Sequence, residues 1–398
     1  MTVLIAMTIK TNAQWITQTS GITNLLNSVY FTDSNTGYAV GGGEMSDGNG
    51  IILKTTNGGT NWTQQTIGTT IGLNSVYFTD ANIGYVVGRQ GTILKTNNGG
   101  ANWTAQTSGT SNDLWSVYFT DSNTGYAVGS WGTILKTNNG GTNWTTQTSG
   151  TNDPLKSVYF YNSNTGYIVG SSGTNGTILK TINGGTNWTA QTSGTTNWLS
   201  SVYFTDSNTG YAVGGGGSSS TILKTINGGT NWIAQTSGTN DPLYSVYFTN
   251  SNIGYIVGSN GTILKTINGG TNWTAQTSGT TNWLGSVYFT DSNTGYVVGS
   301  NGTILKTTNG ASVRENIVKE NINIFPNPAS DIVTLNIDNT NSADLTLNIY
   351  NVIGTLVKSE MLKQNNRQIN IGDLSNGVYM VTIKSKNLTE SQRLIIQK

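Results

Sequence analysis

Residues 116–144 read SVYFTDSNTGYAVGSWGTILKTNNGGTNW, and this stretch recurs along the chain with small changes. Its first four residues begin seven times, at Ser28, Ser75, Ser116, Ser157, Ser201, Ser245 and Ser286. The spacings are 47, 41, 41, 44, 44 and 41 residues. Each copy holds four short segments rich in β-branched and aromatic residues and bounded by Gly and Asn, a pattern typical of strands joined by turns.

The repeat that begins at Ser116 shows how one unit is expected to fold. Its predicted strands are Ser116–Thr120, Tyr126–Gly129, Thr133–Thr137 and Trp144–Thr148, and we call the equivalent strands of every repeat a, b, c and d. The a–b and c–d turns are rich in Asn, Ser and Gly, which tolerate turn dihedral angles. A period of about 40–45 residues with four strands predicts the blade of a β-propeller.

Counting the segments indicates how the ring closes. Ser-Val-Tyr-Phe, Gly-Tyr, Ile-Leu-Lys and the Trp of strand d each occur seven times. However, Trp15 precedes the first strand a, and no Trp follows the last strand c. Pairing of Trp15–Thr19 with Thr303–Thr307 would complete the last blade, so that its strand c is not left as an open edge. The sequence therefore predicts an all-β, seven-bladed β-propeller over residues 14–310, closed by its N-terminal strand.

The c–d turn carries a family resemblance. Thr137-Asn-Asn-Gly-Gly-Thr-Asn-Trp144 resembles the Asp-box, a Ser/Thr-x-Asp-x-Gly-x-x-Trp hairpin of sialidases and other propellers, with Asn139 in place of the Asp. The whole unit resembles the repeats of photosystem II assembly-factor propellers over about residues 15–310. The resemblance implies a propeller fold. It implies little about function, because Asp-boxes are structural hairpins distant from most active sites.

The two ends of the chain depart from the repeat. Near the N-terminus a short apolar stretch precedes Thr11-Asn12-Ala13, which fits a signal-peptidase site before Gln14. We interpret residues 1–13 as a signal peptide that begins upstream of Met1, because a basic n-region is missing; an ordinary N-terminus is the alternative. After Gly310 the charged residues 311–321 lack the repeat and indicate a linker.

The last residues, 322–398, hold alternating strand patterns. They resemble the type A C-terminal sorting domain of the type IX secretion system of certain Gram-negative bacteria. The matching positions are Phe325, Pro326, Asn327, Pro328, Gly354, Gly377 and Tyr379. The resemblance implies a small Ig-like β-sandwich, the type IX secretion machinery as a partner, and a secreted protein or one on the outer-membrane cell surface.

Composition excludes several classes of function. Only 9% of residues are charged and the net charge is +1, so we expect no nucleic-acid partner. The chain has no Cys and no His, which excludes zinc sites built on thiolate or imidazole and a histidine general base. We expect no metal, no cofactor and a monomer, and we assign no catalytic residue.

Most charged residues of the ring recur at fixed positions, as Lys136 does in strand c and Asp121 in the a–b turn. A residue present in nearly every blade is better explained by structure, and we expect these Lys and Asp side chains on one face, where they could pair. Glycoside hydrolysis needs two carboxyl groups about 5–9.5 Å apart. Among the non-repeating acids, Glu44 and Asp47 share one loop, so a glycoside hydrolase remains an alternative.

Variation between blades concentrates in the b–c and d–a loops. Strands alternate in direction, so these loops share one face, which we call the loop face. A Leu lies two residues before every strand-a Ser, but its neighbours differ. The candidate ligand-binding residues on this face are Trp115, Trp131, Trp198, Tyr244, Trp283, Glu44 and Asp47. Aromatic rings suit the apolar faces of sugars or a protein hot spot; alternatively, these rings fill the gaps between blades.

The sequence thus predicts an exported propeller that acts as a non-enzymatic binding or adhesion module, with a polysaccharide or a surface protein as its ligand. Two alternatives remain open. One is the glycoside hydrolase, and the other is an envelope assembly or scaffold factor, by analogy with the photosystem II proteins.

Overall fold

The computed structural model describes residues 15–43, 49–171, 175–310, 322–337, 345–352, 354–362, 368–384 and 389–398. The chain divides into two compact units, residues 1–312 and 313–398, which we describe separately. The predicted signal peptide, the predicted linker, Glu44 and Asp47 lie outside the described residues. Within the described residues, no helix has the length and apolar character needed to cross a membrane.

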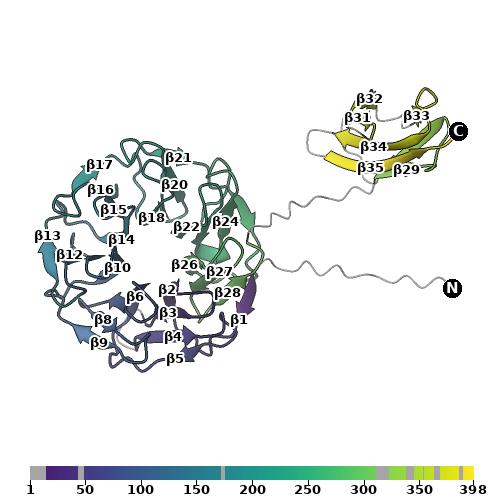
Figure 1. Cartoon of the computed structure of the whole chain (residues 1–398). Coiled ribbons are helices and arrows are strands. Elements are labelled where there is room, and N and C mark those ends of the chain that lie inside the picture. Colours follow the sequence, from purple (N-terminus) through teal and green to yellow (C-terminus); the bar gives the residue numbers. More distant parts are fainter. Residues whose placement is uncertain are drawn as a thin grey trace. The chain divides into compact units, whose positions relative to one another are not determined.

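The first unit is a ring of seven four-stranded antiparallel sheets around a central axis (Figure 1). Strand a lies nearest the axis and strand d lies at the rim. Blade 1 contains β2–β5, and the later blades follow in chain order. Blade 7 contains β26, β27 and β28 with β1 at its edge, so the N-terminal strand closes the ring.

The strands a are β2 (Leu26–Phe31), β6 (Leu73–Phe78), β10 (Leu114–Phe119), β14 (Leu155–Phe160), β18 (Leu199–Phe204), β22 (Leu243–Phe248) and β26 (Leu284–Phe289). The strands b are β3 (Gly37–Gly41), β7 (Gly84–Gly88), β11 (Gly125–Gly129), β15 (Gly166–Ser171), β19 (Gly210–Gly215), β23 (Gly254–Gly258) and β27 (Gly295–Gly299). A 3₁₀ turn, η1 (Ser259–Gly261), follows β23.

The strands c are β4 (Ile51–Thr55), β8 (Ile93–Thr96), β12 (Ile134–Thr137), β16 (Gly176–Thr181), β20 (Ser220–Thr225), β24 (Ile263–Thr266) and β28 (Ile304–Thr307). The strands d are β1 (Ile16–Gln18), β5 (Thr63–Gln64), β9 (Thr104–Gln106), β13 (Thr145–Gln147), β17 (Thr189–Gln191), β21 (Ile233–Gln235) and β25 (Thr274–Gln276).

The predicted closure of the ring is confirmed. In β1, Ile16 pairs with Lys306 and Gln18 with Ile304 of β28. The side chain of Trp15 is only 1% exposed. It packs edge-on against Phe289, with ring centroids 6.0 Å apart, as Trp144 packs against Phe119.

The hydrophobic core lies between blades. In one such layer, Tyr85 of blade 2 stacks on Phe119 of blade 3 with ring centroids 3.9 Å apart. Phe119 also covers Gly125, its partner on the neighbouring strand. A Cβ atom on Gly125 would lie 2.5 Å from the Phe119 ring, which explains why Gly begins strand b in every blade. The Leu that begins each strand a is fully buried.

The c–d hairpin keeps the Asp-box geometry with Asn in place of Asp. The Asn139 side-chain oxygen accepts a hydrogen bond from the backbone N–H of Asn143 (3.0 Å), and the Thr137 hydroxyl oxygen accepts one from the N–H of Gly141 (2.9 Å). The carbonyl of Gly140 accepts hydrogen bonds from the Tyr85 hydroxyl and the Lys95 ammonium of the preceding blade. The hairpin therefore links neighbouring blades.

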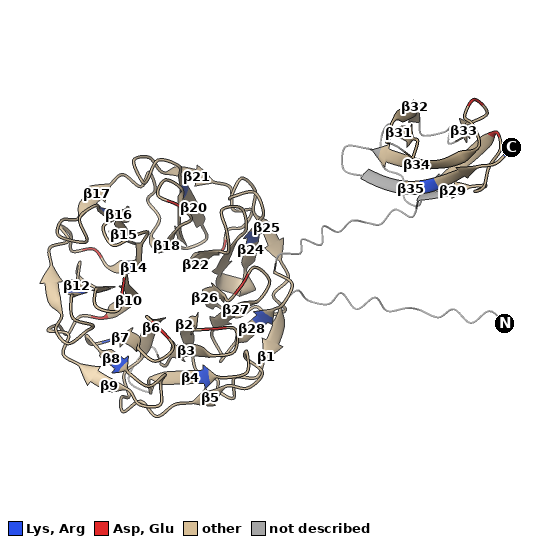
Figure 2. Cartoon of the chain, in the orientation of Figure 1, with Lys and Arg blue, Asp and Glu red and all other residues tan. Residues whose placement is uncertain are grey.

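The expected pairing of the recurring Lys and Asp is wrong. Lys136 donates to the carbonyl of Gly184 (2.7 Å). Asp121 accepts hydrogen bonds from the backbone N–H groups of Asn123 (2.7 Å) and Thr124 (2.8 Å); burial alone would raise the pKa of Asp121, but these bonds outweigh it and lower the pKa. Figure 2 shows the sparse charge of the ring, with basic residues on strands such as β4, β8 and β28.

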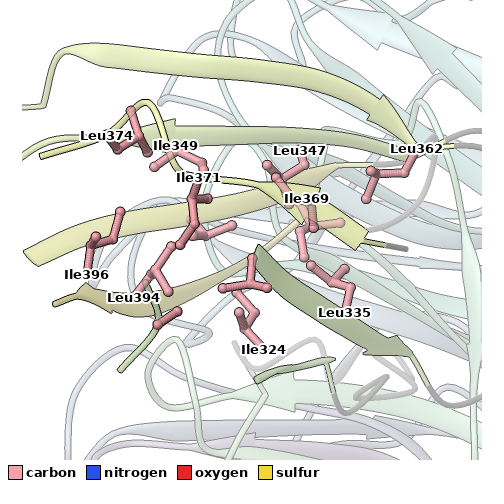
Figure 3. Close-up of a cluster of buried hydrophobic side chains, with 14 residues drawn as sticks. Ile324, Leu335, Leu347, Ile349, Leu362, Ile369, Ile371, Leu374, Leu394 and Ile396 are labelled. Atoms are coloured by element: carbon pink, nitrogen blue, oxygen red, sulfur yellow. The ribbon is translucent and has the colours of Figure 1, made fainter. Parts of the chain in front are cut away.

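The second unit is a sandwich of two antiparallel sheets, which agrees with the predicted β-sandwich. One sheet is β29 (Ile322–Phe325), β30 (Ile332–Ile337) and β33 (Gln368–Asn370). The other is β32 (Leu356–Leu362), β31 (Leu345–Tyr350), β34 (Gly377–Lys384) and β35 (Thr389–Ile396). Ile324 and Leu335 of the first sheet and Leu347, Ile349 and Leu394 of the second belong to one buried cluster (Figure 3).

Asn327 of the sorting motif joins two segments of this unit. Asn327, between Pro326 and Pro328, donates from its amide to the carbonyl of Arg393 (2.7 Å) and accepts from the N–H of Ile395 (2.8 Å). This joins the segment after the exposed Phe325 to β35. Three further motif residues lie elsewhere: Gly354 in a turn with φ of 83°, Gly377 at the start of β34, and Tyr379, whose hydroxyl donates to the carbonyl of Ser375.

Candidate ligand-binding funnel

One position of strand a is irregular in every blade. In blade 3, Leu114 pairs with Gly129, whereas Ser116 pairs with Val128, so Trp115 is an extra residue in the ladder. The same shift follows the buried Leu of all seven strands a. A β-bulge of this kind redirects the side chain of its extra residue. We call these residues the bulge positions.

The bulge positions converge on one hollow. A funnel of about 670 Å³ opens within the first unit, and its lining includes all seven of them. They are Asn27, Asn74, Trp115, Lys156, Ser200, Tyr244 and Gly285. Arg89, Trp198 and Trp283 also line it, from the b–c loop of blade 2 and the d–a loops of blades 5 and 7. Four of the sequence-predicted candidates, Trp115, Trp198, Tyr244 and Trp283, therefore share one cavity.

Blades 2 to 4 contribute positive charge. The Lys156 ammonium lies 3.4 Å from the centroid of the Trp115 ring, a cation–π contact, and the Trp115 indole N–H donates to the Ser130 hydroxyl (3.1 Å). Burial lowers the pKa of Lys156 to about 8; the charge of Asp113 opposes this effect and that of Arg89 adds to it. At neutral pH this part of the funnel carries two cations.

Blades 6 and 7 contribute an aromatic shelf, formed by Tyr244 and Trp283. Their ring centroids are 5.1 Å apart in an edge-to-face arrangement. The Trp283 ring lies across Gly285, where a Cβ atom would be 2.1 Å from its Cη2 atom. Glycine at this one bulge position thus makes room for the indole. Trp198, 43% exposed, is a further aromatic residue of the lining.

Farther along each strand a, a ring of tyrosines surrounds the axis. It consists of Tyr30, Tyr77, Tyr118, Tyr159, Tyr203, Tyr247 and Tyr288, with neighbouring centroids 5.0–5.5 Å apart all the way round. These residues follow the bulge positions by three residues, about 10 Å along the strand. Each hydroxyl donates to a Phe carbonyl of the next blade, as Tyr118 does to Phe160 (2.8 Å). Burial raises the pKa of Tyr118 to about 12, so it stays neutral.

The non-repeating acids that the structure describes form hydrogen bonds with residues in or next to the b–c loops. Asp113 accepts a hydrogen bond from the N–H of Gln90 (2.9 Å), and Asp153 accepts one from the Thr177 hydroxyl (2.6 Å). Asp241 accepts from Thr262 (2.7 Å) and Asn260, and these bonds lower its pKa. Among the described residues that line the funnel, none is a carboxylate.

Trp131 does not join the other candidates. It belongs to the b–c loop of blade 3, its side chain is 72% exposed, and it is not part of the funnel lining. Its φ of 57° lies in the left-handed region, where Asn260 and Asn301 also lie in the corresponding loops. A bulky residue in this conformation is strained.

Sequence reasoning omitted the polar part of the site. Arg89 and Lys156 line the funnel with Asn27 and Asn74, yet none of the four was a predicted site residue. The signal was present in the aligned repeats, because Lys156 and both Asn residues occupy the same variable position as Trp115. The predicted set contained aromatic residues and the two acids Glu44 and Asp47, and left out the amides and the cations.

Comparison with known proteins first explains the second unit. Residues 323–397 match the family model of the secretion system C-terminal sorting domain. This confirms the predicted sorting domain. The protein is therefore exported by type IX secretion to the cell surface or the extracellular space.

Individual relatives are more distant. The endo-acting ulvan lyase of Formosa agariphila is 37% identical over 89 residues, which are 22% of this chain and 17% of the lyase, so the chain spans less than a fifth of that relative. Two solved structures share the propeller fold. YCF48 from Cyanidioschyzon merolae has a TM-score of 0.61 at 20% identity, covering 74% of this chain and 98% of that one. The GH74 xyloglucanase from Xanthomonas campestris has a TM-score of 0.60 at 13% identity, covering 81% and 59%.

The repeats themselves match a family model. It is that of the photosynthesis system II assembly factor YCF48, and the matched residues are 7–107, 106–196 and 188–277. These segments cover well over half of the chain, including most of the ring whose bulge positions line the funnel. The chain belongs to the family of the photosynthesis system II assembly factor YCF48.

Proposed function

We propose that this exported propeller is a non-enzymatic binding module that holds a polysaccharide segment in the funnel. The observation that carries the proposal is the contrast within each blade. The strands repeat almost unchanged, whereas the bulge positions, which all line one cavity, are Asn, Asn, Trp, Lys, Ser, Tyr and Gly. A uniform scaffold with one variable set of convergent side chains is the usual arrangement of a binding site.

The chemistry of the lining suits sugars. The Tyr244–Trp283 shelf offers flat apolar surfaces, and each of these rings combines a large apolar area with one polar O–H or N–H group. Asn27 and Asn74 donate from their amides to the carbonyls of Leu73 and Leu114, both at 2.8 Å. Because an amide side chain has two donors and an acceptor oxygen, each keeps capacity for a ligand hydroxyl.

Binding without cleavage is supported by the distribution of acids. Hydrolysis of a glycosidic bond uses a pair of carboxyl groups. The described non-repeating acids, Asp113, Asp153 and Asp241, are hydrogen-bonded to residues in or next to the b–c loops. The described part of the funnel lining contains cations, amides and aromatic rings, and no carboxylate. The likeness to a GH74 xyloglucanase is one of fold.

The test is a glycan-array screen of the full chain, with reducing-end release measured on every glycan that binds. We expect binding without release. Trp283→Ala and Tyr244→Ala should each weaken binding about tenfold or more, since both remove a ring of the shelf. Trp131→Ala is the matched control, because it removes an exposed Trp of the same face outside the funnel, and it should bind normally. Equal loss in all three variants, no glycan bound, or product release would contradict the proposal.

A further inference from the structure

The funnel is electrostatically polarised. Residues 14–310 contain nine basic residues, and seven of them are the recurring Lys of strand c. The other two, Arg89 and Lys156, both line the funnel. The positive charge that the repeat does not explain is therefore concentrated at blades 2 to 4, while the aromatic shelf lies on blades 6 and 7.

The Lys156 ammonium is held in place. It lies over the Trp115 ring, whose N–H is in turn bonded to Ser130, and the side chain is mostly buried. A positioned, partly desolvated cation attracts an anion more strongly than a solvated surface lysine does. Arg89 adds a planar guanidinium that suits the two oxygens of a carboxylate or sulfate.

Among the described residues, Asp113 is a carboxylate whose charge acts on Lys156. Asp113 accepts the hydrogen bond of the Gln90 N–H at 2.9 Å and is not part of the lining. Counted over the described residues, two cations against one outlying carboxylate give this part of the funnel a net positive charge.

We propose that the ligand is an acidic polysaccharide, with a carboxylate or sulfate group bound by Lys156 and Arg89 and a neighbouring sugar ring stacked on the Tyr244–Trp283 shelf. This inference rests on the proposed function and specifies the class of its ligand. The two groups of residues lie on different arcs of one funnel, so a ligand with an acidic group and an adjacent apolar ring face can contact both.

The experiment compares matched probes by calorimetric titration of the full chain. The first pair is oligogalacturonate and its methyl ester, and the second is a sulfated galactan oligosaccharide and its desulfated form. A poly-glutamate peptide represents an acidic protein ligand. We expect at least one acidic saccharide to bind about tenfold or more tightly than its neutral partner, because hydrogen bonds to charged groups are the stronger ones. The pair that shows this preference identifies the bound acidic group as a carboxylate or a sulfate.

Variants locate the preference. Lys156→Gln and Arg89→Gln should each remove most of it, whereas Lys136→Gln, which loses a Lys bound to a backbone carbonyl outside the funnel, should keep it. Equal affinity for acidic and neutral partners, tighter binding of poly-glutamate, or an unchanged preference in Lys156→Gln would overturn the inference. Binding of neutral glycans that still depends on Trp283 would leave the proposed function standing; failure of every saccharide would remove both.

Discussion

The Lys156 ammonium lies 3.4 Å from the centroid of the Trp115 ring, and this contact joins the bulge positions of blades 4 and 3. Burial lowers the pKa of Lys156 to about 8, Asp113 opposes that shift, and Arg89 reinforces it. The side chain is therefore charged at neutral pH but close to its titration point. The charge is complete well below pH 8 and is lost as the pH rises through this value.

Affinity for an acidic saccharide should follow this titration. Between about pH 7 and about pH 9, binding of the acidic probe should weaken as Lys156 becomes neutral, while binding of its neutral partner should not change. In Lys156→Arg the decline should disappear, because a guanidinium stays charged over this range. Titration calorimetry at several pH values measures the affinity for the acidic probe. An affinity of the unmodified protein that does not change with pH would contradict the role of Lys156.

Gly285→Ala tests the aromatic shelf without removing an aromatic residue. The new Cβ atom would lie 2.1 Å from Cη2 of Trp283, so the indole must move. We expect affinity for the glycan to fall about tenfold, with little change in unfolding free energy, since only the far end of one side chain is displaced. Gly216→Ala is the control, because a Cβ atom there would meet nothing within 4 Å and the residue is not part of the funnel lining, and it should bind nearly as well as the unmodified protein.

The left-handed conformation of Trp131 predicts a stabilising substitution. At the corresponding positions of blades 6 and 7, Asn260 and Asn301 adopt the same backbone conformation, which Asn tolerates better than Trp. Trp131→Asn should raise the free energy of unfolding by about 0.5–1 kcal/mol. The reverse change, Asn301→Trp, should lower it by a similar amount. Denaturant titration measures both, and a loss of stability in Trp131→Asn would show that the indole has an unrecognised packing role.

Ring closure depends on Trp15. Its side chain is 1% exposed and packs against Phe289 and Tyr255, so Trp15→Ala should lower the free energy of unfolding by about 3–5 kcal/mol. The neighbouring Ile16 is 62% exposed, and Ile16→Ala should change stability by no more than about 0.5 kcal/mol. Similar effects of the two substitutions would mean that β1 does not close the ring in solution.

Strand pairing and ring closure could be predicted because they depend on order and count. Trp15 precedes the first repeat and the last repeat lacks its Trp, so pairing the two ends gives every blade four strands. The direction of the loop-face rings could not be predicted, because it depends on the bulge. Leu114 and Ser116 are two residues apart but pair with the consecutive residues Gly129 and Val128. Such a shift becomes visible only when the pairing of the two strands is known.

Contacts between side chains of neighbouring blades could not be predicted from the sequence either. Lys156 follows Trp115 by 41 residues, so their contact appears only when blades 3 and 4 are side by side. The recurring Lys and Asp suggested ion pairs by their opposite charge. In the fold, the turn around Asp121 supplies its partners from backbone N–H groups, and Lys136 reaches the Gly184 carbonyl of the next blade. Backbone groups thus provide both side chains with partners, from the same turn for Asp121 and from the next blade for Lys136.

The central claim is that the bulge positions form the ligand seat. Hydrogen–deuterium exchange of the full chain, with and without the tightest saccharide of the screen, tests it most directly. The account predicts that protection concentrates in the segments that carry the lining, residues 154–156, 198–200 and 283–285 among them. Protection of the c–d hairpins, such as residues 137–144, or of the second unit, with the lining segments unchanged, would contradict it.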